Sequence, residues 1–345
     1  MISAAILGGS GYTGVELMRL LAGHPELELR AVSSRQYRGR AVADIFPSLA
    51  GHVSLAFSDA DPQTLAGQAE IVFLAVPHQA AMQAVPQILP TNTKIVDLSA
   101  DFRLRDPDLY EKYYAPHACP QLLSQAVYGL PEFYRREIAA AGLVANPGCY
   151  VTSVLLALIP LLSAGLISSR GLIADCASGV SGAGRKEEIS LLHGEAHDNF
   201  RPYSVSGHRH TPEMEQELSL AAGEEVRLTF TPHLLPIDRG ILSTVYALPQ
   251  NGIGAEHIRS RWLEVYRGEP FVRILDPGRL PSTKAVRGTN TAQLAVETDP
   301  RSGLLKIFSA LDNLGKGASG QAVQNANLML GLPESMGLAG IAVWP

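Results

Sequence analysis

The first 150 residues alternate short apolar runs with segments of helical spacing, and this alternation limits the chain to few folds. The apolar runs are residues 3–7, 27–32, 70–76 and 94–98, and helical spacing is clearest in residues 15–21 and 80–88. Strands that alternate with helices form a parallel sheet with helices on both faces. The pattern predicts a doubly wound parallel sheet, an α/β architecture.

The rest of the chain has longer strand candidates that follow one another, at 226–231, 241–248, 293–297 and 304–311. Successive strands favour a mostly antiparallel sheet with helices on one face, an α+β domain. A chain of 345 residues also exceeds one ordinary hydrophobic core. We expect one domain over residues 1–148, a second over 149–316, and a C-terminal helix in 317–345 that packs back on the first.

Composition narrows the possible partners. Hydrophobic residues make up 46% of the chain and charged residues 18%, and the net charge is −5 without a long basic run. These values indicate a packed globular protein and argue against nucleic acid and membrane surfaces as partners. Cys119, Cys149 and Cys176 form no C-x-x-C pair, so neither a disulfide framework nor a structural zinc site is expected. We expect a cytoplasmic protein.

A glycine-rich loop, "LGGSGYTGVEL", follows the first strand candidate and opens a helix. Glycines at such a turn let the backbone approach a pyrophosphate that sits on the helix N-terminus. We interpret the loop as the dinucleotide site of a Rossmann-type domain, and a merely structural tight turn is the alternative. The expected contacts are Gly8, Ser10, Gly11, Tyr12, Thr13 and Gly14.

The second strand candidate ends in Ser33, Ser34 and Arg35. An NAD site usually has a carboxylate there, which bonds the ribose 2′-hydroxyl. Hydroxyls and a guanidinium suit a 2′-phosphate instead, so we predict NADP(H) as the cofactor. The alternative is that Arg35 and Arg38 are ordinary solvated charges.

Cys149 follows Asn146-Pro147-Gly148 and precedes a long apolar segment, at a predicted change from strand to helix. A helix N-terminus stabilises a thiolate and offers N–H groups to an oxyanion. Core packing of a small hydrophobic residue explains the position equally well, so the stretch alone leaves both interpretations open. Cys176 lies in a strand-like run and is predicted to be structural, and Cys119 is predicted to be a loop residue.

His208 and His210 flank Arg209 just before a predicted helix start, Thr211-Pro212-Glu213. A thiol nucleophile usually needs an acid or base partner, and this pair is the best candidate. An ordinary surface turn is the alternative. We expect no metal here, because no third ligand stands nearby at a suitable spacing.

Three further stretches place polar residues at strand ends or in glycine-rich turns: "VDLSADFRL", "SGVSGAGRK" and "DNLGKGASG". Strand ends of α/β folds hold ligand contacts, and successive backbone N–H groups can cradle an anion. Each stretch alone is a weak signal, because glycine loops are usually turns.

These motifs occur in an order that resembles a known family. "GGSGYTGVELMRLL", "LAVPH", "DLSADFRL", "NPGCY", "SGVSGAGR", "HRHTPEMEQ", "FTPHLLPIDRGI" and "DNLGKGASGQAVQN" together resemble the N-acetyl-γ-glutamyl-phosphate reductase family over nearly the whole chain. That family is similar in architecture to aspartate-semialdehyde dehydrogenase and, more remotely, to phosphorylating glyceraldehyde-3-phosphate dehydrogenase. The semialdehyde dehydrogenases have Asn directly before the cysteine, whereas this chain has Gly148.

The resemblance implies a catalytic cysteine at Cys149 and an acid/base histidine, with His210 favoured over His208 because it directly precedes the helix. Substrate contacts are assigned to Arg103, by analogy with the semialdehyde dehydrogenases, and to Ser99 and Arg209. Beyond the glycine loop and the end of the second strand, NADP(H) contacts are expected at Pro77, Ser178, Gly179, Gly182, Asn313, Lys316 and Gly317. A homo-oligomer, dimer or tetramer, is also expected.

The implied activity is NADPH-dependent reduction of N-acetyl-γ-glutamyl phosphate to the semialdehyde and phosphate, through a cysteine thioester, in arginine biosynthesis. Reduction of N-acetyl-aminoadipyl or aspartyl phosphate is the alternative in the same class, because one methylene in a pocket discriminates by only about 10–200-fold. A cysteine hydrolase or acyltransferase without redox chemistry is disfavoured by the glycine loop. A redox-inert NADP-sensing regulator would have no need for Cys149 beside a histidine pair.

Overall fold

A computed structural model of the chain describes residues 1–344 and divides it into two compact units. Unit 1 comprises Met1–Pro147 and Ala318–Gly340. Unit 2 comprises Gly148–Gly317 and also includes residues 341–344. The break after Pro147 lies one residue before the domain boundary expected from the sequence.

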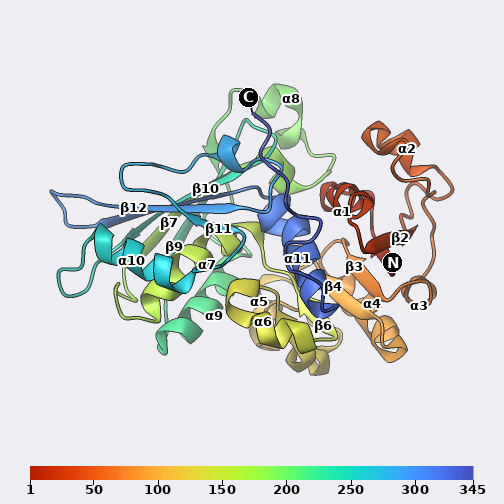
Figure 1. Ribbon diagram of the computed structural model, residues 1–345, viewed down its shortest axis with the longest axis horizontal. Coiled ribbons are helices and arrows are strands. Elements are labelled where there is room, and N and C mark those ends of the chain that lie inside the picture. The colour runs from red at the N-terminus through yellow and green to blue at the C-terminus, as the bar shows by residue number, and fades with distance from the viewer. Residues whose placement is uncertain (345) are drawn as a thin grey trace. The chain divides into compact units, whose positions relative to one another are not determined.

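Unit 1 is built on a six-stranded sheet whose neighbouring strands are all parallel, in the order β2-β1-β3-β4-β6-β5 (Figure 1). The strands are β1 (Ile2–Leu7), β2 (Leu27–Val32), β3 (Ile71–Leu74), β4 (Lys94–Asp97), β5 (Ala126–Tyr128) and β6 (Leu143–Ala145). The helices are α1 (Tyr12–Ala22), α2 (Val42–Ile45), α3 (Pro62–Ala66), α4 (Ala81–Ile88), α5 (Pro107–Tyr113), α6 (Pro131–Ala140) and α11 (Gly320–Met329). Every residue of β3 and β6 is buried, as in strands covered on both faces. The predicted parallel α/β sheet is confirmed.

The strand order of unit 1 reverses at β1, because β2 lies on one side of it and β3 on the other. In open α/β sheets, ligands bind at the carboxyl ends of the strands where the order reverses. Gly8 directly follows β1 with φ +86°, and a Cβ at Gly8 would lie 2.7 Å from the carbonyl oxygen of Ala75, just after β3. The glycine loop therefore stands at the switch point of the sheet.

The C-terminal segment of unit 1 returns to the sheet, where α11 packs against α1, α6 and β4 (Figure 1). Asn325 on α11 donates to the carbonyl oxygen of Gly129 at 2.9 Å and to Oδ1 of Asn146 at 3.0 Å. The helix ends at Met329, and Gly331 follows with φ +69°. The expected helix in 317–345 is thus shorter than predicted, since a left-handed glycine commonly terminates a helix; residue 345 lies outside the described residues.

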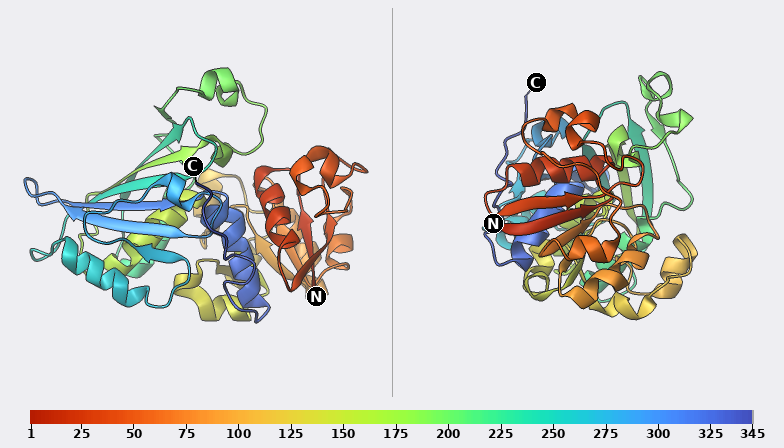
Figure 2. Two further views of the ribbon diagram at one scale, coloured as in Figure 1. Left: turned by 45° about the horizontal axis from the view of Figure 1, so that its top comes forward. Right: turned by 90° about the vertical axis from the view of Figure 1, so that its right-hand side faces the viewer.

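Unit 2 is built on a seven-stranded sheet in the order β11-β12-β13-β10-β7-β9-β8. The strands are β7 (Leu172–Gly179), β8 (Arg201–Pro202), β9 (Leu228–Leu235), β10 (Ile241–Ala247), β11 (Val272–Ile274), β12 (Ala292–Thr298) and β13 (Leu305–Leu311). Only the β7–β9 and β11–β12 pairs are parallel, so the predicted, mostly antiparallel sheet is confirmed. The helices are α7 (Cys149–Leu162), α8 (His193–Ala196), α9 (Thr211–Ala222) and α10 (Ala255–Val265), and α7, α9 and α10 pack on the sheet (Figures 1 and 2).

Helix α7 is the buried centre of unit 2. Pro160 lies inside it and cannot donate to the carbonyl oxygen of Leu156, and the Tyr266 hydroxyl donates there instead at 2.5 Å. Near the other end of α7, the Ser153 hydroxyl bonds those of Ser243 on β10 at 2.8 Å and Ser309 on β13 at 3.0 Å. These buried bonds fix the helix, and with it the turn at Cys149, against the sheet. No helix within residues 1–344 has the length and apolar character needed to cross a bilayer.

Candidate active site

The glycine loop of unit 1 leaves open space at the N-terminus of α1. Gly11 is the N-cap residue of α1, and a Cβ built on it would meet no atom within 4 Å. Gly14 differs, since its Cβ would lie 2.5 Å from the carbonyl carbon of Gly9, so the helix packs directly on the loop there. The first turn of α1 carries no acidic residue. An open helix N-terminus with this charge fits a pyrophosphate.

Two serines at the end of β2 hold the glycine loop in place. Ser33 Oγ accepts a hydrogen bond from the N–H of Gly8 at 3.2 Å, and Ser34 Oγ donates to Ser10 Oγ at 3.0 Å. Both serines are only 5% exposed. Their hydroxyls therefore support the loop, and residues 33–35 at the end of β2 include no carboxylate.

Two arginines follow those serines, and the structure separates their roles. Arg38 forms an ion pair with Asp59 at 2.7 Å. Arg35 is exposed and forms no ion pair with any of residues 1–344. Of the two guanidiniums, that of Arg35 is therefore the one available to a bound 2′-phosphate.

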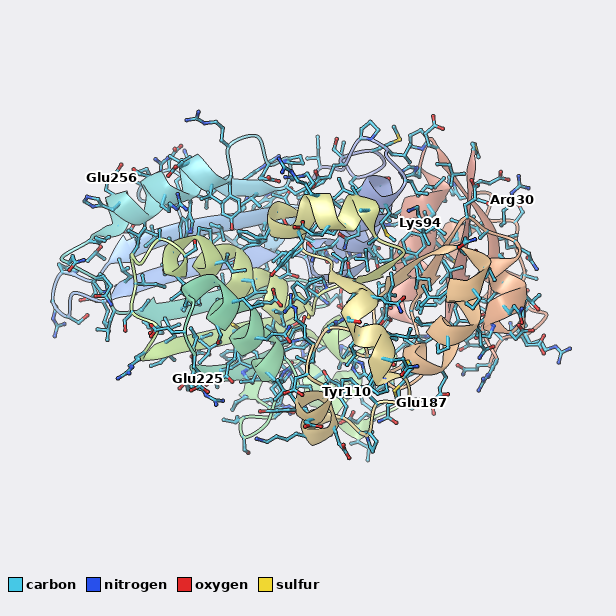
Figure 3. The ribbon with its side chains drawn as sticks, turned by 90° about the horizontal axis from the view of Figure 1, so that it is seen from below. Arg30, Lys94, Tyr110, Glu187, Glu225 and Glu256 are labelled. Carbon is cyan, nitrogen blue, oxygen red and sulfur yellow. The ribbon has the colours of Figure 1, made fainter. Side chains whose placement is uncertain are left out.

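The turn after β4 places Ser99, a predicted substrate contact, in a buried polar network. Ser99 is buried, and its hydroxyl donates to Oδ2 of Asp97 at 2.9 Å while its N–H donates to Oδ1 at 2.8 Å. Burial, followed by the nearby Asp101, raises the pKa of Asp97 to about 7. Asp101 in turn accepts from the hydroxyl of Tyr110 at 2.8 Å. Tyr110 belongs to α5 and is labelled in Figure 3. The Ser99 hydroxyl is thus used inside this buried network, and a substrate contact at Ser99 stays a prediction.

Arg103 lies at the end of the same turn and is also buried. Its Nε donates to the carbonyl oxygen of Asn146 at 2.7 Å, and its Nη2 donates to that of Leu98 at 2.8 Å. The guanidinium therefore braces the chain three residues before Cys149, in addition to any contact with a ligand. Arg209, the other arginine predicted to touch substrate, is exposed, as is Pro77 in the loop after β3.

Cys149 is the first residue of α7, with Gly148 as the N-cap residue in extended conformation. The first helical hydrogen bond runs from the N–H of Thr152 to the carbonyl oxygen of Gly148, at 2.9 Å. The N–H groups of the intervening residues therefore belong to the open helix end, where anions are stabilised. Cys149 is partly exposed, whereas Cys119 and Cys176 are buried, and burial raises their pKa to about 11 and about 12.

His210 lies directly against the residue before the cysteine. A Cβ on Gly148 would be 2.5 Å from Nε2 of His210, so a larger residue would displace the imidazole from this position. This contact gives a physical reason for glycine directly before Cys149. Glu213, which the sequence interpretation missed, accepts from the N–H of Gly148 at 2.9 Å and is 1% exposed. The one local signal for it was an acidic residue in the first turn of a predicted helix.

His208 belongs to an aromatic cluster. Its ring centroid lies 4.8 Å from that of His210 and 5.1 Å from that of Phe230, with Tyr150 and Tyr203 at the edges. Its Nδ1 accepts from the N–H of His210 at 3.1 Å. Burial, followed by the charge of Arg209, lowers the pKa of His208 to about 4. His208 is therefore neutral at pH 7 and orients the backbone of His210.

The turn at Gly315–Ser319 contacts the cysteine from another side. A Cβ on Gly317 would lie 2.8 Å from Cβ of Cys149, so this glycine is needed for close packing against Cys149. Lys316 is fully buried, with Nζ 6.0 Å from the centroid of the Phe271 ring. The ammonium group of Lys316 thus lies in the interior, and a cofactor contact at Lys316 stays a prediction.

The loop after β7 and the Asn313 side chain form one packed unit. Asn313 accepts from the N–H of Gly240 at 2.7 Å and donates to Ser181 Oγ at 2.9 Å. A Cβ on Gly182 would lie 2.8 Å from Ser178 Oγ, and one on Gly179 would lie 2.7 Å from the carbonyl oxygen of Asp238. Ser178 and Asn313 are 2% exposed, so their side chains hold the loop, and a ligand contact there stays a prediction.

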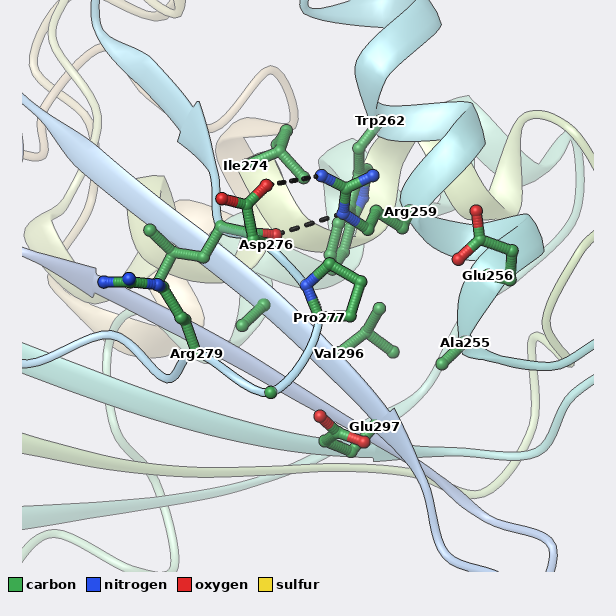
Figure 4. Close-up of a pocket in the computed structure, with 13 residues that line it drawn as sticks. Ala255, Glu256, Arg259, Trp262, Ile274, Asp276, Pro277, Arg279, Val296 and Glu297 are labelled. Atoms are coloured by element: carbon green, nitrogen blue, oxygen red, sulfur yellow. Dashed lines mark hydrogen bonds and ion pairs between the residues drawn. The ribbon is translucent and has the colours of Figure 1, made fainter.

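A pocket of about 70 Å³ lies elsewhere in unit 2, between α10 and strands β11 and β12 (Figure 4). Arg259 on α10 bonds Asp276 there, with Nη2 3.1 Å from Oδ1. The cavity is lined by none of the residues predicted from the sequence to form the site. It is therefore separate from the surroundings of Cys149.

Comparison with known proteins gives matches over both units. Residues 3–141 match the family described as semialdehyde dehydrogenase, NAD binding domain, and residues 149–313 match semialdehyde dehydrogenase, dimerisation domain. Among solved structures, aspartate semialdehyde dehydrogenase II from Vibrio cholerae, complexed with ASA, has a TM-score of 0.72 at 17% identity, covering 96% of this chain and 98% of that chain. Aspartate semialdehyde dehydrogenase with NADP from Candida albicans has a TM-score of 0.71 at 15% identity, with the same coverage. At these identities the likeness concerns the fold.

Sequence relatives are much closer. N-acetyl-γ-glutamyl-phosphate reductase from Citrifermentans bemidjiense is 52% identical over 100% of both chains, and that from Geobacter sulfurreducens is 51% identical over the same share. The enzyme of the same name from Moorella thermoacetica is 49% identical over 98% of both chains. The resemblance drawn from the motifs is thereby confirmed, and the chain belongs to the N-acetyl-γ-glutamyl-phosphate reductase family.

Proposed function

We propose that this protein reduces N-acetyl-γ-glutamyl phosphate to N-acetylglutamate 5-semialdehyde and phosphate, in arginine biosynthesis, with NADPH as reductant and Cys149 as nucleophile. The observation that carries the proposal is the position of Cys149 at the start of α7, with the His210 imidazole against Gly148. Relatives of this name at about half identity over the full chain support the choice of substrate.

The first stage is transfer of the acyl group to the cysteine. The Cys149 thiol passes its proton to His210, and the thiolate attacks the γ-carbonyl carbon of the acyl phosphate. The carbon–oxygen bond to the phosphoryl group breaks, and the proton held on His210 goes to the departing phosphate. N–H groups in the first turn of α7 stabilise the charge that develops on the carbonyl oxygen. The acyl group remains on Cys149 as a thioester.

The second stage releases the product. When bound, NADPH supplies a hydride to the thioester carbon. The first turn of α7 and His210 stabilise the resulting alkoxide, which then expels the Cys149 thiolate as the carbon–sulfur bond breaks. The semialdehyde leaves, and the thiolate recovers a proton from solvent through His210. A thiol suits both stages because it is a good nucleophile and a good leaving group.

The residues present in unit 1 fit the reductant. The open space at Gly11 and the start of α1 would hold the pyrophosphate, with Ser10, Tyr12 and Thr13 beside it. Ser33 and Ser34 shape the loop for the ribose, and Arg35 would bind the 2′-phosphate. Pro77 belongs to the same proposed site, because it follows β3 at the switch point of the sheet.

The proposal is tested by running the reaction in reverse with purified protein, NADP⁺, phosphate and N-acetylglutamate 5-semialdehyde. We expect NADPH to form, as measured by its absorbance, and we expect formation to require phosphate. N-acetyl-aminoadipate and aspartate semialdehydes are the comparison substrates, and a higher kcat/KM with either would overturn the substrate assignment. Tight NADPH binding with no turnover on any substrate would instead support a regulatory protein.

Replacing Arg35 with Asp is expected to weaken NADPH binding by at least about tenfold and to change NADH binding little. A carboxylate in that position repels the 2′-phosphate and can accept from a ribose 2′-hydroxyl. Fluorescence titration of both cofactors gives the two Kd values. The matched control is Arg38→Asp, whose guanidinium is paired with Asp59 and should matter less. Equal binding of NADH and NADPH by the unsubstituted protein would contradict the cofactor assignment.

We further propose that the protein is a homo-oligomer. The match of residues 149–313 to a dimerisation domain supports this assembly. Light scattering on the eluted protein measures the number of chains.

A further inference from the structure

Glu213 is a buried carboxylate beside the candidate nucleophile that the proposed mechanism does not use. It is 1% exposed, and its Oε1 accepts from the N–H of Gly148 at 2.9 Å. A buried charge persists only where hydrogen bonds or charges compensate its lost hydration. For Glu213 this compensation includes the hydrogen bond from the amide of Gly148, the residue directly before Cys149. Gly148 and Glu213 are 65 residues apart in the sequence.

One turn of backbone carries both Glu213 and His210. Helix α9 starts at Thr211, His210 is its N-cap residue, and Glu213 is its third residue. The His210 imidazole occupies the place that a Cβ of Gly148 would take, and the Glu213 carboxylate holds the Gly148 amide. Two contacts from the same turn thus set the distance between His210 and the start of α7.

We propose that Glu213 is a positioning residue, which holds the Gly148 amide so that Cys149 and the first turn of α7 stay aligned with the His210 imidazole. The alignment of the Cys149 thiol does not depend on which reaction the protein catalyses. Only the expected effect of Glu213 on turnover rests on the proposed function. If the Glu213 carboxylate is removed, the Gly148 N–H stays buried beside His210 but loses its hydrogen-bond acceptor. A buried N–H without an acceptor is unfavourable, so the turn shifts until the N–H reaches another acceptor. A displacement of about 1 Å at reacting groups costs on the order of 100-fold in rate.

Three substitutions separate the reach of this side chain from its charge. Glu213→Gln keeps an oxygen at the same distance and loses the charge, and Glu213→Asp keeps the charge and is shorter by one methylene. Glu213→Ala removes both. We expect Glu213→Gln to retain kcat within about threefold, and Glu213→Asp and Glu213→Ala to lose about 10- to 100-fold, with the Kd for NADPH unchanged.

The second readout is the pH dependence of Cys149 alkylation by iodoacetamide, which needs no substrate and no reductase activity. The midpoint should move to higher pH in Glu213→Asp and Glu213→Ala, because the thiolate loses its alignment with the helix end. It should not move upward in Glu213→Gln. This readout keeps a failure of the positioning role distinct from a failure of the proposed reaction.

Glu217 supplies the matched control. It lies one turn further along α9, is also 1% exposed, and its Oε1 accepts from Nε2 of Gln216 at 2.9 Å. Glu217→Ala should lower stability without moving the alkylation midpoint. The proposal is overturned if Glu213→Gln is as impaired as Glu213→Asp, because charge would then be the requirement. Unchanged kcat and alkylation in Glu213→Asp would overturn it equally, and this pair decides the matter even if Glu213→Ala does not fold.

Discussion

Cys149→Ser is expected to lower reductase activity by more than about 10³-fold, because a serine hydroxyl at the start of α7 is not ionised near neutral pH and forms no thioester. The substitution removes one sulfur atom from a partly exposed residue, so the fold should survive. The Kd for NADPH should stay unchanged, since the glycine loop belongs to unit 1. Reverse-reaction rates and a fluorescence titration of NADPH measure the two effects.

The other cysteines provide the control for this prediction. Burial raises the pKa of Cys119 to about 11 and that of Cys176 to about 12, so both are protonated at pH 8. Iodoacetamide should therefore label Cys149 first, as peptide mass analysis would show, because the thiolate fraction governs the rate. Full activity in the serine variant, or faster labelling of Cys176 in the unsubstituted protein, would rule out the covalent mechanism.

His210→Asn is expected to reduce kcat by about 10²- to 10⁴-fold with little change in the Kd for NADPH, since a general acid or base contributes in that range. His210 touches Gly148 directly, whereas His208 contacts the aromatic cluster. The pH–rate profile of the His210 variant should lose a limb that the unsubstituted enzyme has. His208→Asn should keep that limb and act more on KM, because the low pKa of His208 leaves it neutral in the working range.

The stability of the two variants distinguishes them further. The pKa of His208 is about 4 in the folded chain, against an ordinary value of 6.5, so the unfolded chain binds more protons between those two pH values. Unfolding free energy therefore rises with pH across this window, and His208→Asn should flatten that rise.

Reversed effects of the two variants on kcat would exchange their roles. If neither variant lost more than a few-fold, the acid or base would lie elsewhere, and His78 and His233 would be tested next.

Local patterns were sufficient to predict the secondary structure around the site. The apolar run at 27–32 became β2 with the same bounds, and the helix expected after Gly148 begins at Cys149. The glycine loop could also be recognised, because tight turns and close backbone approach require glycine whatever surrounds them. Such features depend on a few neighbouring residues, so they can be recognised in the sequence without knowledge of the fold.

Contacts between distant segments could not be predicted in the same way. Lys316 and Ser99 looked available to ligands in the sequence, yet both are buried and contribute to packing or to a polar network. The sequence alone does not show whether the side chain of a charged or hydroxyl residue faces solvent or the interior. Burial depends on which segments fold together, and no local pattern records that.

The sequence by itself determined the two kinds of sheet, the glycine loop, and the cysteine at a helix start, because periodicity and glycine geometry are local properties. The tertiary structure alone decided what surrounds that cysteine. It brought His210 and Glu213 onto Gly148 and placed His208, partly buried, among aromatic rings. It also paired Arg38 with Asp59 and left Arg35 exposed. Each of these outcomes is a distance or a burial between residues far apart in the chain, and such quantities exist only once the chain has folded.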